Sequence, residues 1–141
     1  MAGLLLNLKP YEKFLVGGIV LQNGQRRSQL RILDDKAGVL RLSEALHPDR
    51  VKTPLTRAYY AAQSIVVGDE SEVSGGKILR HLLEEALRGF EGFDFAETLH
   101  ETYQEAEKSN YYKVLKLLHP LLAKEAALLL QVNKSDPAVN D

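Results

Sequence analysis

Four arginines in the N-terminal part of the chain have the chemistry to bind phosphate groups. They are Arg26, Arg27, Arg31 and Arg41, and Lys9 stands in an earlier turn where it could join them. A guanidinium group presents a planar fork of donors that grips a phosphate through two hydrogen bonds, and it also stacks on unpaired bases. The five side chains therefore predict a surface for an anionic polymer, and we expect that polymer to be RNA.

The segment around residue 30 indicates how some of these side chains are positioned. In an extended strand, alternate residues point to opposite faces of the sheet. Leu30 and Ile32 would then face a core, whereas Arg27, Gln29 and Arg31 would share the other face. The pattern predicts a strand that is apolar on one side and cationic on the other.

Asn23-Gly24 stands between two apolar runs and predicts a tight hairpin turn, because both residue types accept the positive φ that such turns need. The paired strands would be residues 19–22 and 25–33. This hairpin would hold Arg26, Arg27 and Arg31 on one scaffold.

The charge distribution supports a polyanionic partner but also allows simpler explanations. Residues 1–60 carry ten Lys or Arg against five Asp or Glu, a charge of +5, whereas residues 61–141 carry a charge of −6. Such segregation indicates a nucleic-acid-facing module, or else two surfaces of opposite sign that dock on each other. The arginines could also form a solvated strand face with salt bridges to Asp34, Asp35 and Glu44, which is the commoner role of a charged run.

Motifs for catalysis and for metal binding are incomplete. Gly75-Gly76-Lys77 resembles a phosphate-binding loop, but Ser71 replaces its first glycine and Ile78 replaces the hydroxyl that binds Mg²⁺. Glu97 and His100 have the spacing of a di-iron motif, which needs a second such pair and two further carboxylates. We expect no enzyme activity, no catalytic residues, no metal and no cofactor.

Composition indicates a cytoplasmic protein. The chain of 141 residues has no cysteine, which fits a reducing compartment. The apolar run at residues 4–6 is too short for a signal peptide, and no run approaches the length that spans a membrane. We therefore expect no membrane association.

The N-terminal part of the chain predicts a small antiparallel β-sheet or sandwich. About five short strands are indicated, at residues 4–8, 13–16, 19–22, 25–33 and 39–42, with Gly17-Gly18 as a bend or tight turn. A sheet of this size is marginal alone, so helices or a second subunit must cover it.

The C-terminal part predicts four helices, which makes the chain an α+β protein. The first begins at Thr53-Pro54, the second lies at residues 78–90 after a loop, the third begins with a capping pair of Asp94 and Glu97, and the fourth runs from about 111 to 131. Pro120 should kink the fourth helix or split it near Lys116. We assign residues 1–44 to a β module, 45–131 to a helical half that covers the sheet and mediates self-association, and 132–141 to a disordered tail.

The order of several segments resembles the FlbT family of flagellum biosynthesis regulators. These segments are Leu8-Lys9-Pro10-Tyr11-Glu12-Lys13, Gly17-Gly18-Ile19-Val20, Asn23-Gly24-Gln25-Arg26-Arg27, Val39-Leu40-Arg41, Thr53-Pro54 with Arg57-x-x-Tyr60-x-x-Gln63, and Asn110 to Leu117. The resemblance covers most of residues 4–130. Two positions depart from the family pattern: Tyr11 stands where glycine is expected, and Pro120 interrupts a helix that is usually without proline.

The resemblance implies a post-transcriptional regulator that binds the 5′ leader of flagellin mRNA and represses translation or promotes mRNA decay. Some members act positively, so the direction of the effect stays open. Residues 39–44 are also distantly similar to carbon-storage-regulator RNA-binding proteins, which implies paired subunits and places Arg41 and Lys9 near RNA. These likenesses shift the preference toward an RNA-binding role for the arginines. The alternative is an adaptor or chaperone for flagellin or another flagellar regulatory protein.

Overall fold

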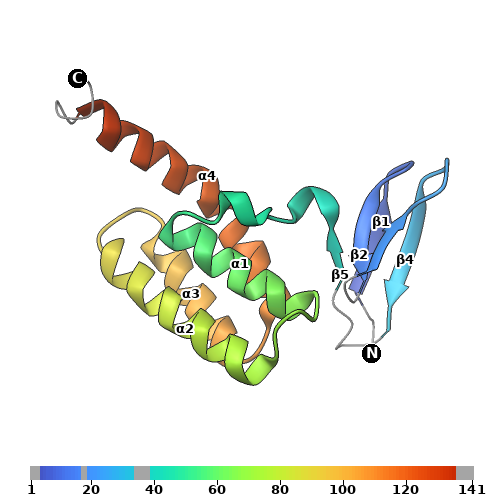
Figure 1. The fold of residues 1–141 in the computed structure, drawn as a ribbon, viewed down its shortest axis with the longest axis horizontal. Helices are drawn as coiled ribbons and strands as arrows, with labels where there is room; N and C mark the ends of the chain where they lie inside the picture. The colour runs from blue at the N-terminus through green and yellow to red at the C-terminus, as the bar shows by residue number, and fades with distance from the viewer. Residues whose placement is uncertain (1–3, 17–18, 34–38, 136–141) are drawn as a thin grey trace.

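The computed structural model describes residues 4–16, 19–33 and 39–135, and it has the α+β architecture that the sequence predicts (Figure 1). Five strands come first and four α-helices follow. The strands are β1 (Leu4–Leu8), β2 (Lys13–Val16), β3 (Ile19–Gln22), β4 (Ser28–Ile32) and β5 (Val39–Arg41). The helices are α1 (Pro54–Val66), α2 (Glu72–Gly89), α3 (Ala96–Glu107) and α4 (Tyr111–Ser135), preceded by the 3₁₀ turns Leu42–Glu44 and Pro48–Arg50.

The first four strands form one long, bent antiparallel ribbon. β1 pairs with β4 so that Leu6 lies opposite Leu30, and β2 pairs with β3 so that Val16 lies opposite Ile19. Between the two pairs, the amide of Tyr11 donates to the carbonyl of Gly24 at 3.0 Å, which keeps the connecting segments together. β5 then pairs with the free side of β2, which gives the strand order β3-β2-β5 in the second sheet.

The predicted hairpin between residues 19–22 and 25–33 is wrong. Gly24 does not take the positive φ of a primed turn, because positive φ at described glycines occurs only at Gly68 and Gly92. The Asn23 side-chain amide instead donates to the carbonyls of Lys9 and Arg26, at 2.8 and 2.9 Å. β3 pairs instead with β2. Gly17-Gly18, which we predicted as a bend or tight turn, lies outside the described residues.

Tyr11 adopts the left-handed conformation, with φ at 60°. A residue with a Cβ pays roughly 1–2 kcal/mol there, whereas glycine pays no steric cost. The glycine that the resemblance predicts at this position would therefore fit the backbone without this cost. The tyrosine ring itself is exposed.

The first helix begins as the sequence predicts. Thr53 caps α1 by accepting a hydrogen bond from the Thr56 amide, and Pro54 occupies the first helical position. Glu125 of α4 completes this cap, because its carboxylate accepts a short hydrogen bond from the Thr53 hydroxyl and another from the Leu55 amide at 3.0 Å. Glu125 is buried, so these two donors compensate for the loss of water around its charge.

The second helix begins earlier than predicted and contains the glycine pair that we placed in a loop. Ser71 caps its N-terminus. A Cβ on Gly75 would lie 2.7 Å from the Ile65 side chain, and one on Gly76 would lie 2.9 Å from the Tyr111 hydroxyl. The two glycines therefore allow α2 to approach α1 and α4 closely, and they have no phosphate-binding loop geometry.

The third and fourth helices also depart from the predictions. Asp94 does not cap α3, which begins after Phe95 without a side-chain cap. The entry into α3 is set by packing instead, because buried Phe95 contacts the rings of Phe90 and Phe93 with centroids 5.1 and 5.9 Å away. Helix α4 continues through Pro120 without a break and remains helical to Ser135, beyond the predicted start of the tail at residue 132.

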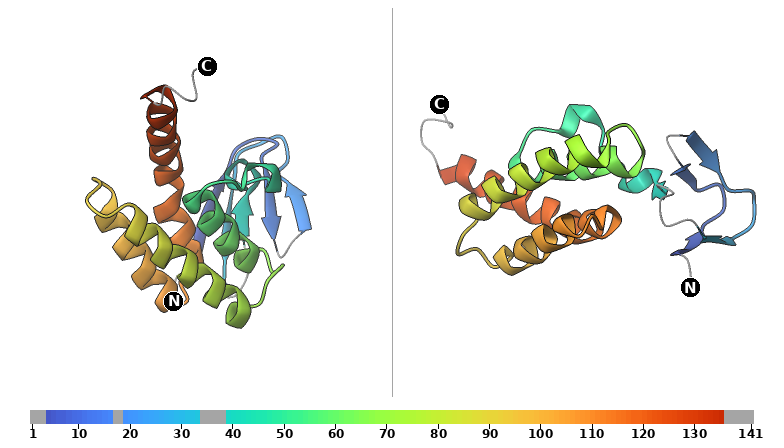
Figure 2. Two further views of the ribbon diagram at one scale, coloured as in Figure 1. Left: turned by 60° about the vertical axis from the view of Figure 1, so that its left-hand side comes forward. Right: turned by 90° about the horizontal axis from the view of Figure 1, so that it is seen from below.

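The two halves have separate cores and meet over a small area. Four buried residues, Leu6, Leu8, Phe14 and Val39, hold the β module together. The helical core is much larger and takes in only Leu40 and the partly buried Leu15 from the strands. The β module lies beyond one end of the helices, joined to them through residues 42–53 (Figure 2). The expectation that helices cover the sheet is therefore wrong; whether residues 1–44 and 45–131 are separate folding units stays a prediction.

Candidate nucleic-acid interface

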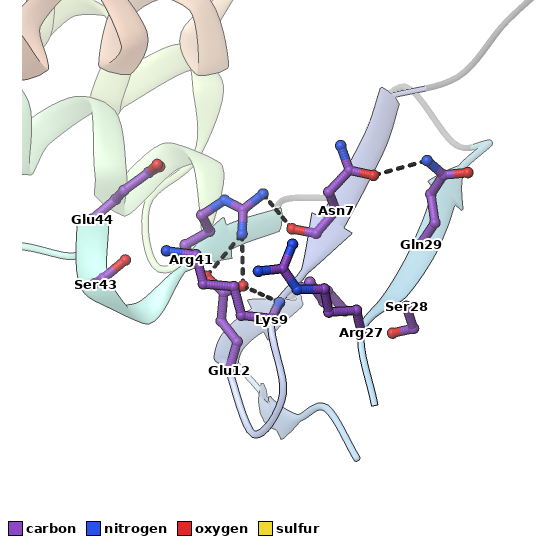
Figure 3. A pocket seen from close by; sticks show the side chains of 10 residues that line it. Asn7, Lys9, Glu12, Arg27, Ser28, Gln29, Arg41, Ser43 and Glu44 are labelled. Carbon is purple, nitrogen blue, oxygen red and sulfur yellow. Dashed lines mark hydrogen bonds and ion pairs between the residues drawn. The ribbon is translucent and has the colours of Figure 1, made fainter. Parts of the chain in front are cut away.

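A polar cleft of about 890 Å³ opens on the β module (Figure 3). It is formed where the end of β1, the start of β4 and the segment after β5 meet. Its walls carry Asn7, Leu8, Lys9, Glu12, Arg27, Ser28, Gln29, Arg41, Ser43 and Glu44. Three of the five predicted RNA-binding residues, Lys9, Arg27 and Arg41, therefore lie in one cleft although they are far apart in the sequence.

Arg41 is held by other residues of the cleft. Its Nη1 lies 2.8 Å from both carboxylate oxygens of Glu12, and its Nη2 donates to the carbonyl of Asn7 at 2.7 Å. The two charged side chains are only 23% and 14% exposed. This arrangement ties β5 to the β1–β2 connection and commits much of the donor capacity of Arg41 within the chain.

Glu12 is stabilised in its charged form by two neighbours. The backbone amide of Lys9 donates to its Oε1 at 2.9 Å, and the Arg41 guanidinium lies beside it. These hydrogen bonds, with the amide contributing most, lower the pKa of Glu12 below the ordinary 4.5 in spite of partial desolvation. The carboxylate is therefore charged at neutral pH and neutralises part of the positive charge of Arg41.

Lys9 and Arg27 present their charges differently from Arg41. Both residues are exposed, and neither side chain hydrogen-bonds or ion-pairs with another described residue. Between β1 and β4, the amide of Gln29 donates to the side-chain oxygen of Asn7 at 2.8 Å, so the wall beside them is polar and ordered. The cleft thus combines two available cations with amide groups that could hydrogen-bond to a base or a sugar.

Arg31 lies on the same strand face as this wall but outside the cleft. In the β1–β4 pair, Arg31 is opposite Leu5 and Gln29 is opposite Asn7, on the face away from the Leu6–Leu30 pair. Two residues along a strand correspond to about 6.6 Å, so Arg31 extends the polar face beyond Gln29. The register agrees with the predicted alternation in β4, and Ile32 packs against the core of the β module. The prediction that Leu30 faces a core is wrong, because Leu30 is 38% exposed.

Arg26 is exposed but does not line the cleft. The two acidic residues proposed as its neighbours, Asp34 and Asp35, lie outside the described residues. The third, Glu44, stands in the cleft wall, and its carboxylate forms no ion pair with a described residue. With respect to the described residues, Arg41 is the one member of the five that forms a salt bridge, and its partner is Glu12.

Sequence reasoning missed the residues that organise the cleft. Glu12, Asn7 and Asn23 act through hydrogen bonds to distant backbone and side chains, which depend on the strand pairing. A signal did exist for Glu12, because a carboxylate three residues after Lys9 can accept from the amide that begins the turn. Nothing local in the sequence indicated its pairing with Arg41.

The described residues hold no group of three or more His, Asp or Glu side chains placed to bind a metal ion. Glu97 and His100, which have the di-iron spacing, therefore belong to no such group among the described residues. None of the described helices is long and apolar enough to cross a membrane.

Comparison with known proteins places this chain in a family. A family model described as flagellar protein FlbT matches residues 4–129. The chain belongs to the FlbT family. The residues that line the cleft all lie within this matched range.

Individual FlbT proteins resemble the chain to different extents. The flagellum biosynthesis repressor protein FlbT of Caulobacter vibrioides is 49% identical over 57 residues, which is 40% of each chain. A probable flagellum biosynthesis repressor FlbT of Rhodopseudomonas palustris is 29% identical over 128 residues, which covers 89% of this chain and 97% of the relative. The match thus spans less than half the length of the Caulobacter protein but nearly all of the Rhodopseudomonas protein. No solved structure gives a significant match.

Proposed function

We propose that this FlbT-family protein is a cytoplasmic post-transcriptional regulator of flagellum biosynthesis that binds the 5′ leader of flagellin mRNA. In this proposal, binding represses translation or promotes decay of the message. The observation that carries the proposal is the cleft in which Lys9 and Arg27 stand together without a salt bridge to a described residue. The charge of Lys9 also acts on the Glu12 carboxylate, which Arg41 already holds. Relatives named flagellum biosynthesis repressors support the regulatory part. The protein would act by binding and not as an enzyme.

The five cationic residues take different roles in this proposal. Lys9 and Arg27 contact phosphates inside the cleft. Arg26 and Arg31 contact the RNA chain where it leaves the cleft. Arg41 holds the cleft together through its bonds to Glu12 and Asn7. It would contribute to RNA binding mainly by fixing the shape of the cleft, and otherwise through the side of its guanidinium that these bonds leave open. Asn7 and Gln29 offer amide groups to base edges. Phosphate contacts would supply most of the affinity, which makes binding salt-dependent.

The experiment is a binding titration with a labelled flagellin leader RNA. We expect Lys9→Gln combined with Arg27→Gln to weaken binding about tenfold or more, because two charge-assisted contacts are lost. The slope of log affinity against log salt should fall by about 0.7 for each phosphate contact removed. Arg88→Gln is the matched control, since Arg88 is an exposed arginine near the end of α2, away from the cleft. Equal affinity of the double variant and this control would refute the assignment.

A second candidate function is an adaptor for flagellin or for a flagellar regulatory protein. Exposed aliphatic residues favour it: Ile19, Val20 and Leu21 on the edge strand β3, and Leu129 and Leu130 on the projecting part of α4 (Figure 1). The same surfaces support self-association, which we also propose. Purification of the full chain from its host separates the candidates. Co-purified RNA that dissociates in high salt supports the first, whereas a stoichiometric protein partner without RNA supports the adaptor.

A further inference from the structure

A second hollow, of about 410 Å³, lies next to the cleft on the helical half. It forms where the segment between β5 and α1 crosses α1 and α4. Ser43 to His47 and Arg50 line it from this segment, and Tyr59, His119 and Leu122 line it from the helices. Ser43 and Glu44 belong to the walls of both cavities, so the two cavities adjoin at these residues. Ser43 and Glu44 lie on the side of the cleft nearest the helices (Figure 3).

Buried polar side chains hold the wall of this hollow in place. The Tyr59 hydroxyl donates to the carbonyl of Glu44 at 2.7 Å. Gln63 makes two bonds to Leu46, accepting from its amide at 2.7 Å and donating to its carbonyl at 3.1 Å. Both Tyr59 and Gln63 are buried in α1. The segment is therefore fixed to the helical core, and the hollow exists before any ligand arrives.

The hollow concentrates groups that donate to anions. Arg50 is exposed, and its side chain makes no ion pair or hydrogen bond with another described residue. The Nδ1 atom of His47 accepts from the Asp49 amide at 3.1 Å and lies 3.4 Å from the Asp49 carboxylate. His119 lies against Tyr59 with ring centroids 6.0 Å apart. Among the described residues that line the hollow, Arg50 is therefore the group best placed to contact a phosphate.

Glu44, between the two cavities, has the opposite chemistry. Its carboxylate has no hydrogen-bond or ion-pair partner among the described residues, and its side chain is partly exposed. A carboxylate repels phosphate, but it accepts hydrogen bonds from the amino groups of adenine, cytosine and guanine. Single-stranded RNA can turn a base toward such an acceptor while its phosphates contact cations on either side.

We propose that single-stranded RNA continues from the cleft across Ser43 and Glu44 into this second hollow. Arg50 contacts a phosphate there, and Glu44 accepts a hydrogen bond from the amino group of the base at the crossing. This inference rests on the proposed function, because it extends the same RNA beyond Lys9 and Arg27. Glu44 would then determine which base is preferred at the crossing. Arg50 would determine how the affinity depends on the length of the RNA.

The first test compares two lengths of leader RNA. The probes are the shortest leader fragment that the wild-type protein binds and the same fragment extended by about six nucleotides, within the usual range of single-strand sites. We expect Arg50→Gln to weaken binding of the long probe about fivefold, to lower its salt slope by about 0.7, and to leave the short probe unchanged. The matched control is Arg88→Gln, which should change neither.

The outcomes separate this inference from the proposed function. If Lys9→Gln with Arg27→Gln weakens both probes while Arg50→Gln behaves like Arg88→Gln, RNA binds the cleft but the path into the hollow is wrong. If the wild-type protein binds neither probe, the proposed function fails first. Equal weakening of short and long probes by Arg50→Gln would contradict the role of Arg50 in length dependence, because RNA would then reach Arg50 without the added nucleotides.

The second test addresses Glu44. The bases of the long probe are replaced one at a time by uracil, which has no amino group. We expect one position at which the wild-type protein loses about fivefold or more in affinity, while Glu44→Ala shows no loss at that position. A position-dependent profile that is the same for both proteins would overturn the role of Glu44. Circular dichroism of the variant verifies that it remains folded.

Discussion

The two halves of this protein are stabilised to very different degrees. The helical half buries aliphatic residues from all four helices in one continuous core, and α4 even supplies the carboxylate that caps α1. The β module has a core of four residues and leaves three consecutive aliphatic residues of β3 exposed. Its polar cleft is held by hydrogen bonds and one ion pair. The comparison indicates that the helical half contributes most of the stability, whereas the β module leaves polar and aliphatic groups exposed for binding to a partner.

The largest effect should come from truncating matched leucines in the two cores. Leu118→Ala in α4 removes a fully buried side chain and should lower the free energy of unfolding by about 3 kcal/mol. Leu6→Ala in β1 should cost less in global stability, because its core is small and opens on its own. Thermal unfolding measures the first effect, and hydrogen exchange measures the local opening of residues 4–33. Equal global losses would show that the two halves unfold as one unit.

A smaller effect on stability should distinguish a glycine that packs closely against a neighbouring helix, Gly75, from one that does not, Gly89. Gly75→Ala places a methyl group 2.7 Å from Ile65, so we expect a loss of about 1–2 kcal/mol even after the gain in helix propensity. Gly89→Ala, at the end of the same helix, meets nothing within 4 Å and should be neutral or slightly stabilising. Denaturant unfolding of both variants checks this. A stabilised Gly75→Ala protein would mean that α1 and α2 can move apart at no cost.

The smallest effect concerns the ion pair of the cleft and its pH dependence. Because the folded protein lowers the pKa of Glu12, this residue contributes stability that is fully present above its unfolded value near 4.5 and is lost as pH falls through the lower folded value. Glu12→Gln should remove this acid-sensitive contribution, on the order of 1 kcal/mol for a partly exposed pair. Asp49→Asn is the control, since Asp49 is exposed and lies outside the cleft. Local hydrogen exchange of the β module between pH 3 and 6 is the measurement. An unchanged pH profile in Glu12→Gln would contradict the role of the pair.

Much of the architecture followed from local sequence. The boundaries of β1, β2 and β3 were predicted correctly because short aliphatic runs between turn residues leave little choice. Thr53-Pro54 fixed the start of α1 in the same way. Among the predicted site residues, Lys9 was placed in a turn and Arg27 on a strand, and the structure brings both into one cleft. These are properties of neighbouring residues, which a sequence displays directly.

The errors share one physical cause, which is that distant residues decided the outcome. Asn23-Gly24 has the composition of a hairpin turn, but its amides and carbonyls found partners in residues 9–12. Gly75 and Gly76 look like loop residues until the approach of α1 and α4 is known. Asp94 does not cap α3, because the start of this helix is set by the packing of Phe95 against two other phenylalanines.

The amino-acid sequence by itself determined the α+β composition, most element boundaries and the supply of cations near the N-terminus, since each depends on residues close in the chain. The tertiary structure alone decided which cations stand together and which are neutralised. Arg41 and Glu12 are 29 positions apart, and only the pairing of β2 with β5 joins them while Lys9 and Arg27 keep their charges available. Charge depends on residue type, but the electrostatic potential of a site depends on distance between charges, which folding sets.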